Sequence, residues 1–175
     1  MNNTSNDKLY KNNDKLYKSI TELLIKHNLT ISTMESCTAG LIATLLTNKE
    51  GASAIMKGAF VTCSNEAKIM QGVSEECIAK NGVYSVETAV EMARACKKAY
   101  NSNIGIGVTG VIDRPDSNNH SYNIIYYAII INNKVFTRKY IPDSNIERFR
   151  QKSFIANHIG IDLIAMLDEN LGYFV

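Results

Sequence analysis

A carboxylate, a hydroxyl and a thiol stand side by side at Glu35, Ser36 and Cys37, directly before an apolar run. Residues 29–34 alternate apolar and polar side chains, which predicts a strand, and residues 38–47 read as a helix. Ser36 is then expected on the turn between them, where the first N–H groups of the helix are free. A serine there can attack a carbonyl while these N–H groups hold the oxyanion, or the groups can bind a phosphate. Helix capping is an alternative role that involves no chemistry.

A serine nucleophile needs a base, and the chain offers histidines and one well-placed lysine. The histidines are His27, His120 and His158, and none follows a predicted strand with an acidic residue to orient it. Lys68 follows the predicted strand 57–64, and burial near the edge of a sheet would lower the pKa of its amine. Lys68 is therefore the candidate base, with a solvated lysine on a helix surface as the alternative.

The cysteines favour neither a metal site nor a disulfide framework. Cys37, Cys63, Cys77 and Cys96 form no C-x-x-C pair, and no histidine lies near them at the spacing of zinc ligands. We therefore expect no metal. A helix N-terminus would stabilise the thiolate of Cys37 and make it reactive. Buried free cysteines usually act as small packing residues, however, and we favour that role.

Length and composition indicate an ordinary globular protein. A chain of 175 residues most often forms one domain, and 45% hydrophobic with 21% charged residues is typical of soluble proteins. The net charge of +2 is spread along the chain, which argues against a nucleic-acid partner. We expect no membrane-spanning segment. The polar N-terminus lacks the apolar stretch of a signal peptide, so we expect a cytoplasmic protein.

The N-terminus contains a short internal repeat. Residues 6–11, NDKLYK, recur at 13–18, which is too short a pattern to establish a coiled coil. Because this composition cannot bury itself, residues 1–13 are predicted to be a flexible extension, and residues 14–175 a single domain.

The rest of the chain interleaves strands and helices. The pattern predicts a helix at 16–27, a strand at 57–64, short helices near 65–71 and 74–80, a helix from 86 capped by Ser85, a strand at 104–110, a hairpin of 123–132 with 134–141, and a last helix after Ser144. The apolar face of the last helix is predicted at Phe149, Ala156, Ile159, Leu163 and Met166. This order indicates an α/β fold with three layers and a mixed sheet.

Several separated segments resemble one family. Residues 35–53, ESCTAGLIATLLTNKEGAS, look like the E-S-C-T-G-G-L-x-A-x-x-L-T-x-x-x-G-A-S signature of the CinA C-terminal domain family, the nicotinamide-nucleotide amidases. Residues 57–73, KGAFVTCSNEAKIMQGV, are similar to its G-G-x-V-x-Y-S-N-x-x-K-x-x-x-L-G-V. Residues 81–93, NGVYSVETAVEMA, resemble G-A-V-S-x-E-x-A-x-x-M-A, and GVTG at 107–110 matches the start of T-G-I-A-G-P-x-G-G. The resemblance runs from about residue 14 to residue 168.

The resemblance implies a fold, a reaction and a catalytic pair. The family's fold is an α/β/α sandwich, and its members are usually homodimers that use neither a metal nor an organic cofactor. The implied reaction converts nicotinamide mononucleotide and water to nicotinic acid mononucleotide and ammonia, so the partner would be a small-molecule nucleotide. By position, Ser36 would be the nucleophile and Lys68 its base.

The resemblance also indicates which residues border the substrate. The predicted substrate-binding residues are Glu35, Cys37, Thr38, Thr109, Gly110 and Arg148. Arg148 would contact the phosphate, whereas Glu35 could instead hold Lys68 or a backbone amide.

The chain departs from the family pattern at three places. Cys63 replaces the tyrosine of the family's Ser-Tyr-Lys catalytic set, residues 111–123 replace its glycine loop, and Ser144 replaces the first arginine of G-D-R. Cys63 would then contribute little, or a water would relay the proton in place of the phenol. Three hypotheses follow: a nicotinamide-nucleotide amidase, an amidase or esterase for another small substrate, or a nucleotide-binding relative without turnover.

Overall fold

A five-stranded sheet forms the centre of the computed structural model, which describes residues 3–112 and 123–171. The strands are β1 (Ile31–Glu35), β2 (Met56–Val61), β3 (Ile104–Gly110), β4 (Ile125–Ile131) and β5 (Lys134–Tyr140), in the spatial order β2-β1-β3-β4-β5. β2, β1 and β3 are parallel, whereas β4 and β5 pair in antiparallel fashion. The predicted mixed sheet and the predicted hairpin are therefore confirmed.

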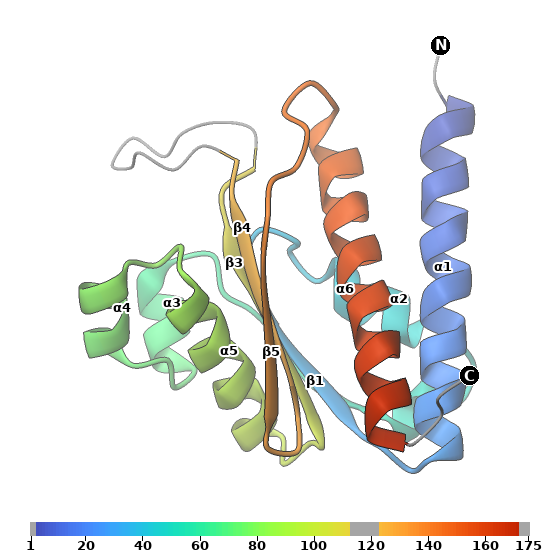
Figure 1. Ribbon diagram of the computed structural model, residues 1–175, viewed down its shortest axis with the longest axis horizontal. Coiled ribbons are helices and arrows are strands. Elements are labelled where there is room, and N and C mark those ends of the chain that lie inside the picture. Colours follow the sequence, from blue (N-terminus) through green and yellow to red (C-terminus); the bar gives the residue numbers. More distant parts are fainter. Residues whose placement is uncertain (1–2, 113–122, 172–175) are drawn as a thin grey trace.

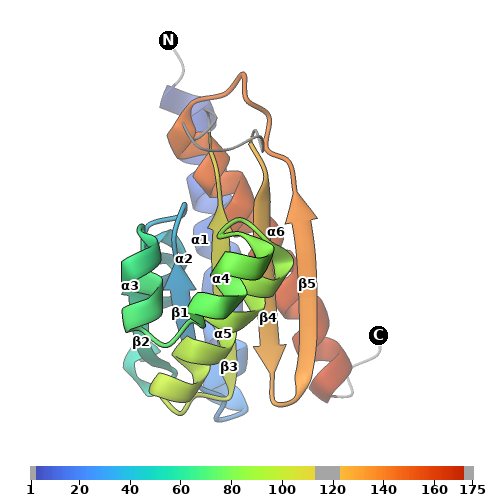
Figure 2. The same cartoon turned by 90° about the vertical axis from the view of Figure 1, so that its left-hand side faces the viewer.

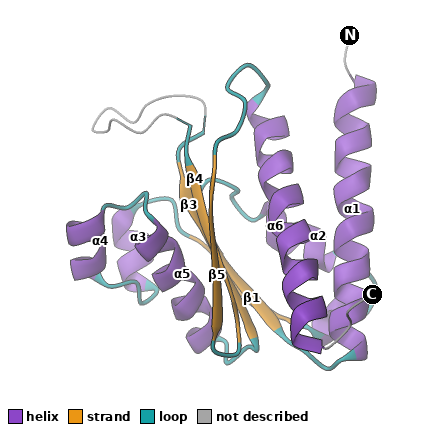
Figure 3. Ribbon diagram, viewed as in Figure 1, coloured by secondary structure: helices purple, strands orange, loops and turns teal. Residues whose placement is uncertain are grey.

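Helices cover both faces of the sheet and complete the three predicted layers (Figures 1 and 3). The helices are α1 (Asn3–Lys26), α2 (Leu41–Thr47), α3 (Asn65–Met70), α4 (Glu75–Asn81), α5 (Val86–Ala99) and α6 (Arg148–Leu171), with a 3-10 turn at Ala52–Ala54. α1, α2 and α6 pack on one face. α3, α4 and α5 lie on the other, toward the viewer in Figure 2.

The alternation of side chains in β3 explains how these layers meet. Ile104, Ile106 and Val108 point into the larger core shared with α1, α2 and α6. Gly105 and Gly107 face α5, where an added Cβ would collide with the carbonyl oxygens of the helix. The two glycines therefore let α5 lie directly on the central strand.

Local capping fixes where the helices of the second layer begin. Ser64, Ser74 and Ser85 each accept a hydrogen bond from the backbone N–H three residues further on, at the starts of α3, α4 and α5. The predicted cap at Ser85 is thereby confirmed. One prediction for α6 is wrong: Phe149 is 48% exposed, because it lies in the first turn, before the helix reaches the core.

A buried carboxylate ties the last helix to the strands of the hairpin. Asp162 of α6 accepts hydrogen bonds from the Tyr127 hydroxyl of β4 and from Arg138 of β5, whose Nε and Nη2 lie 2.7 and 2.8 Å from its two oxygens. Both the charge and the planar fork of Arg138 suit this contact. These three residues hold α6 against the antiparallel half of the sheet.

The first helix extends through the predicted domain boundary. α1 begins at Asn3, so residues 3–13, which were predicted to form a flexible extension, are helical. Asn13 is fully buried: its Nδ2 donates to the Ser153 carbonyl at 2.7 Å, and its Oδ1 accepts from Asn157 Nδ2 at 2.9 Å. Because both groups of the Asn13 amide are hydrogen-bonded, Asn13 can be buried and stabilise this part of the helix, whereas the polar composition predicted exposure to solvent.

α1 and α6 are the longest helices described, with 24 residues each. Each of these helices packs apolar side chains of one face against the larger hydrophobic core. Across residues 3–112 and 123–171, no helix has the length and apolar character needed to cross a bilayer.

We expect Asn13→Ala to lower the free energy of unfolding by about 1–3 kcal/mol, because it leaves the Ser153 carbonyl and the Asn157 amide without their partner. Urea denaturation of the purified chain measures the change. Asn12→Ala is the matched control, since Asn12 is exposed and a surface substitution of this kind stays within about 0.5 kcal/mol. Equal effects of the two substitutions would contradict the buried position of Asn13.

Candidate active site

Ser36 lies directly after β1, at the carboxyl ends of the parallel strands. Glu35, the last residue of β1, pairs with Val61 of β2 and Val108 of β3. The Ser36 N–H donates to the Val108 carbonyl at 3.0 Å, and the Ser36 carbonyl accepts from the Ala39 N–H at 3.1 Å. The carboxyl edge of a parallel sheet is the usual place for a ligand in such folds.

Lys68 reaches this edge from α3. Its Nζ donates hydrogen bonds to the Ser36 Oγ at 3.4 Å, to the Thr62 carbonyl at 2.8 Å and to the Ser64 carbonyl at 3.5 Å. The predicted meeting of the serine hydroxyl and the lysine amine is therefore observed. Sequence reasoning found the two side chains but missed the Thr62 and Ser64 carbonyls, because backbone groups leave no signal in a sequence.

The surroundings of Lys68 favour its neutral form. The side chain is fully buried. Burial lowers the pKa of the amine from its ordinary value of 10.5, because a charged ammonium is poorly solvated there; the nearby Cys63 and Cys37 oppose this shift. A neutral amine has two hydrogens and one lone pair. If its two hydrogens are on the Thr62 and Ser64 carbonyls, the lone pair is left for the Ser36 hydroxyl, which then becomes the donor in the 3.4 Å contact.

Glu35 organises the turn that carries Ser36. The residue is fully buried. Its carboxylate accepts hydrogen bonds from the hydroxyls of Thr33 (3.2 Å) and Thr38 (2.8 Å) and from the N–H groups of Gly40 (3.0 Å), Ile42 (3.2 Å) and Ala43 (2.9 Å). Glu35 thus holds backbone amides, one of its two predicted alternatives, and Lys68 is not among its hydrogen-bond partners in the described residues.

This arrangement corrects the predicted oxyanion site. α2 begins at Leu41, and residues 36–40 form a turn before it, so the helix starts three residues later than predicted. Its first N–H groups are occupied by Glu35. In the described part of the chain, the N–H groups of Cys37 and Thr38 make no hydrogen bond to another residue, and they lie nearest in sequence to Ser36.

Cys37 and Thr38 lie beside Ser36 but offer no free side-chain group. Cys37 is only 7% exposed, and burial raises the pKa of its thiol to about 12, so the packing role is the one supported. The Thr38 hydroxyl is committed to Glu35. The positive charges of Lys152 and Arg148 oppose the effect of burial and act to lower the pKa of the Cys37 thiol.

The remaining predicted residues occupy different positions around the same edge. Thr109 is buried and its hydroxyl donates to the Val83 carbonyl at 2.9 Å, while Gly110, at φ +148°, packs against the Ile124 carbonyl. Arg148 is exposed at the start of α6, and its Nη1 donates to the Ile112 carbonyl at 2.7 Å. The altered loop falls mostly on residues 113–122, outside the described residues.

Cys63 occupies the position of the family's tyrosine. It lies between Thr62 and Ser64, whose carbonyls hold the Lys68 amine, and its side chain is exposed. Among the groups that oppose the effect of burial, Cys63 contributes most to raising the pKa of the Lys68 amine. The hydroxyl of Thr62, by contrast, is buried and has no hydrogen-bond partner in the described structure. Residues 62–68 contain no tyrosine that could supply a phenol beside Lys68.

Comparison with known proteins identifies the family. A family model described as the CinA C-terminal domain matches residues 13–161. The chain belongs to this family. CinA-like proteins of Fervidobacterium nodosum and Kosmotoga olearia are 47% identical over 93 residues and 36% identical over 122 residues. These matches cover 53% and 69% of the chain but only 23% and 30% of the relatives, so the chain spans about a quarter to a third of their length.

Solved CinA structures share the fold. A competence/damage inducible protein from Agrobacterium tumefaciens is 31% identical and superposes with a TM-score of 0.80 over 89% of this chain and 95% of its own. A CinA superfamily protein from Enterobacter cloacae is 23% identical, with a TM-score of 0.81 over 89% and 92% of the two chains, and supports the fold alone. The α/β/α prediction for this CinA domain is confirmed.

Glu35→Gln is expected to lower the free energy of unfolding by about 2 kcal/mol or more, because an amide NH₂ would replace one acceptor oxygen and face N–H donors. Thermal and urea denaturation measure this loss. Glu50→Gln is the matched control, since Glu50 is exposed, and a change within about 0.5 kcal/mol is expected there. A Glu35→Gln protein as stable as the control would show that the carboxylate does not hold the turn.

Proposed function

We propose that this CinA domain hydrolyses the carboxamide of a pyridine nucleotide, nicotinamide mononucleotide, to the acid and ammonia. The observation that supports the proposal is the 3.4 Å approach of the buried Lys68 amine to the Ser36 hydroxyl. A nucleophile paired with a base whose pKa is lowered by burial is the arrangement that acyl transfer requires. The family resemblance supplies the substrate.

Acylation begins at Ser36. Its Oγ attacks the amide carbon and its proton passes to the neutral Nζ of Lys68, while the C=O electron pair moves onto the oxygen. The N–H groups of Cys37 and Thr38 hold this oxyanion. The oxyanion then collapses, the C–N bond breaks, and Lys68 returns its proton to the leaving nitrogen as ammonia departs.

Deacylation reverses the roles. Water attacks the ester at Ser36, and Lys68 takes a proton from it. When the ester C–O bond breaks, the proton returns to the Oγ of Ser36, and nicotinic acid mononucleotide is released. The cations Arg148 and Lys152, near Cys37, bind the phosphate of the nucleotide.

The purified chain is expected to release ammonia from nicotinamide mononucleotide, with kcat/KM rising with pH. Lys68 accepts a proton only when it is neutral, so activity appears as the pH rises through its pKa, which lies below 10.5, and is lost as the pH falls below it. Coupled ammonia assays between pH 6 and pH 10 measure the profile.

Ser36→Ala is expected to lower kcat/KM by about 1,000-fold or more, and Lys68→Met by about 100-fold or more. Ser19→Ala, at an exposed position on α1, is the control and should leave the rate unchanged. Full activity of folded Ser36→Ala protein would overturn the proposal.

A binding protein without turnover is the second candidate, and Cys63 is the observation that favours it. A thiol replaces the phenol of the family's catalytic set beside Lys68. In this alternative, the site binds the nucleotide and the domain acts as a sensor.

Cys63→Tyr is expected to raise kcat/KM by at least about tenfold if the domain is a weakened amidase, because a phenol restores a proton relay. The exposed position accommodates the ring. Cys63→Phe is the matched control, since it adds the ring without the hydroxyl. If neither variant turns over the nucleotide and both bind it tightly by calorimetry, the binding role is the correct one.

A further inference from the structure

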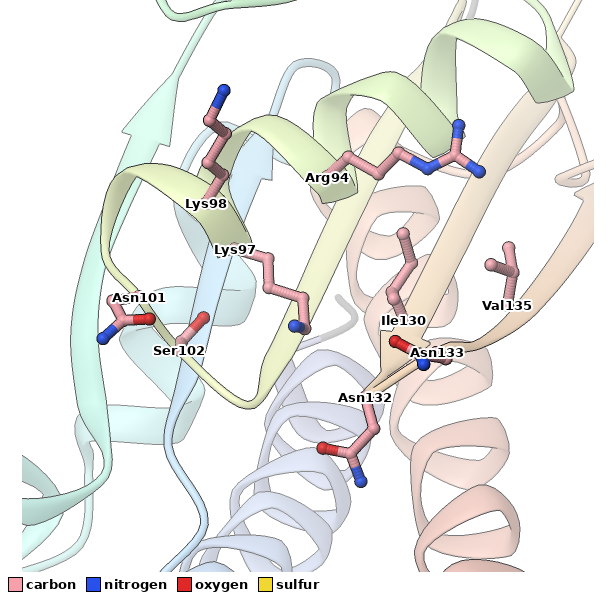
Figure 4. Close-up of a pocket in the computed structure, with 9 residues that line it drawn as sticks. All are labelled: Arg94, Lys97, Lys98, Asn101, Ser102, Ile130, Asn132, Asn133 and Val135. Carbon is pink, nitrogen blue, oxygen red and sulfur yellow. The ribbon is translucent and has the colours of Figure 1, made fainter.

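A hollow lies between the C-terminal part of α5 and the β4–β5 turn, and Figure 4 shows the residues that line it. Its volume is about 510 Å³. It is lined by Arg94, Lys97 and Lys98 of α5, by Asn101 and Ser102, and by Ile130, Asn132, Asn133 and Val135 around the β4–β5 turn. A volume of this size is within the range of small-molecule sites, which is roughly 300–1,000 Å³.

The strand register separates this hollow from the Ser36–Lys68 pair. Ser36 follows Glu35, which pairs with Val108 near the end of β3. Ser102 precedes β3, and the β4–β5 turn follows Ile131, which pairs with Ile104 at the start of β3. The length of β1 therefore lies between the two sites, roughly 13 Å at about 3.3 Å per residue.

The charge in the hollow is positive and comes from Arg94 and Lys97, because the Lys98 side chain points away from the other lining residues (Figure 4). No acidic side chain lines it. Arg94 pairs with Glu91 at 3.1 Å, an exposed contact that a ligand can replace at little cost. The side-chain ammonium groups of Lys97 and Lys98 make no ion pair or hydrogen bond to the described residues. The C-terminus of α5 contributes about half a negative charge, which stabilises the two lysines but does not cancel them.

The position of Lys97 is defined by its packing. A Cβ at Gly105 would lie 2.8 Å from the Cβ of Lys97, so the glycine leaves room for the lysine stem on β3. Figure 4 shows Lys97 extending from α5 toward Asn132 and Asn133, with Arg94 directed toward Val135. The ammonium thus enters the space between α5 and the hairpin turn.

Neutral donors and an apolar wall complete the hollow. The side-chain amides of Asn101, Asn132 and Asn133 make no hydrogen bond to the described residues, so their donors and acceptors are available. Ile130 and Val135 supply aliphatic surface. The Ser102 hydroxyl, by contrast, is engaged by Ser32 and the Ile104 carbonyl.

We propose that this hollow binds a phosphorylated small molecule of nucleotide size, with its phosphate on Lys97 and Arg94. The packed Lys97 and the weakly paired Arg94 are suited to bind phosphate oxygens. The unpaired asparagine amides are suited to hydrogen-bond a polar ring. The aliphatic wall contacts the apolar part of the molecule. The site is separate from the proposed amidase site and does not depend on its activity.

Titration of the isotope-labelled full chain with ADP, followed by amide NMR, tests the proposal. Shifts are expected at residues 101–103 and 130–135, with an affinity that weakens as salt is raised. Lys97→Ala should weaken ADP binding at least about tenfold, because a hydrogen bond to a charged group is lost. Asn133→Ala should weaken it about threefold, on the smaller scale of a neutral hydrogen bond.

Two controls make the result decisive. Lys11→Ala removes an exposed lysine from α1, on the opposite layer, and should leave ADP binding unchanged. Adenosine lacks the phosphates and should produce no comparable shifts. The proposal is wrong if ADP shifts only amides around Ser36 and Lys68, if Lys97→Ala binds ADP as wild type does, or if adenosine binds equally well. None of these outcomes affects the amidase assay.

Discussion

The buried carboxylate of Glu35 is the constraint on which the candidate site depends. It ends β1, and its two oxygens accept hydrogen bonds from the hydroxyl of Thr33 in β1, from the hydroxyl of Thr38 in the turn, and from three backbone N–H groups of the turn and the start of α2. An anion without water needs such donors, and a helix N-terminus supplies them. The turn is thereby held in one conformation, and Ser36 is presented at the strand edge. The signature glutamate is thus a supporting group, and the serine next to it is the proposed nucleophile.

Lys68 is held by the same principle with the signs reversed. Its amine is removed from water and receives backbone carbonyls of Thr62 and Ser64 in place of a carboxylate. Carbonyls satisfy the hydrogens of the amine without supplying the full negative charge that would keep it protonated. A buried anion bound to amides and a buried amine bound to carbonyls thus flank Ser36 from the two sides of β1. The backbone provides most of the hydrogen-bond partners of Glu35 and Lys68.

The fold and the pairing of Ser36 with Lys68 could be predicted from the sequence, because they depend on local pattern and on motifs. The strand at 104–110, the cap at Ser85 and the positions of Ser36 and Lys68 after predicted strands could all be read from neighbouring side chains. The backbone N–H partners of Glu35 could not be predicted, because every residue type except proline carries the same backbone N–H group. The burial of Asn13 was also hidden, since it depends on Ser153 of α6, and a polar repeat by itself indicates solvent. Contacts between segments far apart in the sequence, such as that of Asn13 with Ser153, cannot be predicted from composition.

The repeated hexapeptide in α1 has a geometric consequence. Its two copies start seven residues apart, at Asn6 and Asn13, within one continuous helix. Seven residues advance a helix by roughly 10 Å and turn its stripe by only about 20°, so a duplication of this length keeps every later side chain in phase. Tyr17 and Leu24, themselves one such step apart, remain directed at the core. An insertion in units of seven is therefore nearly silent for the body of the protein, and lengthening at this end is the kind of change the architecture absorbs most readily.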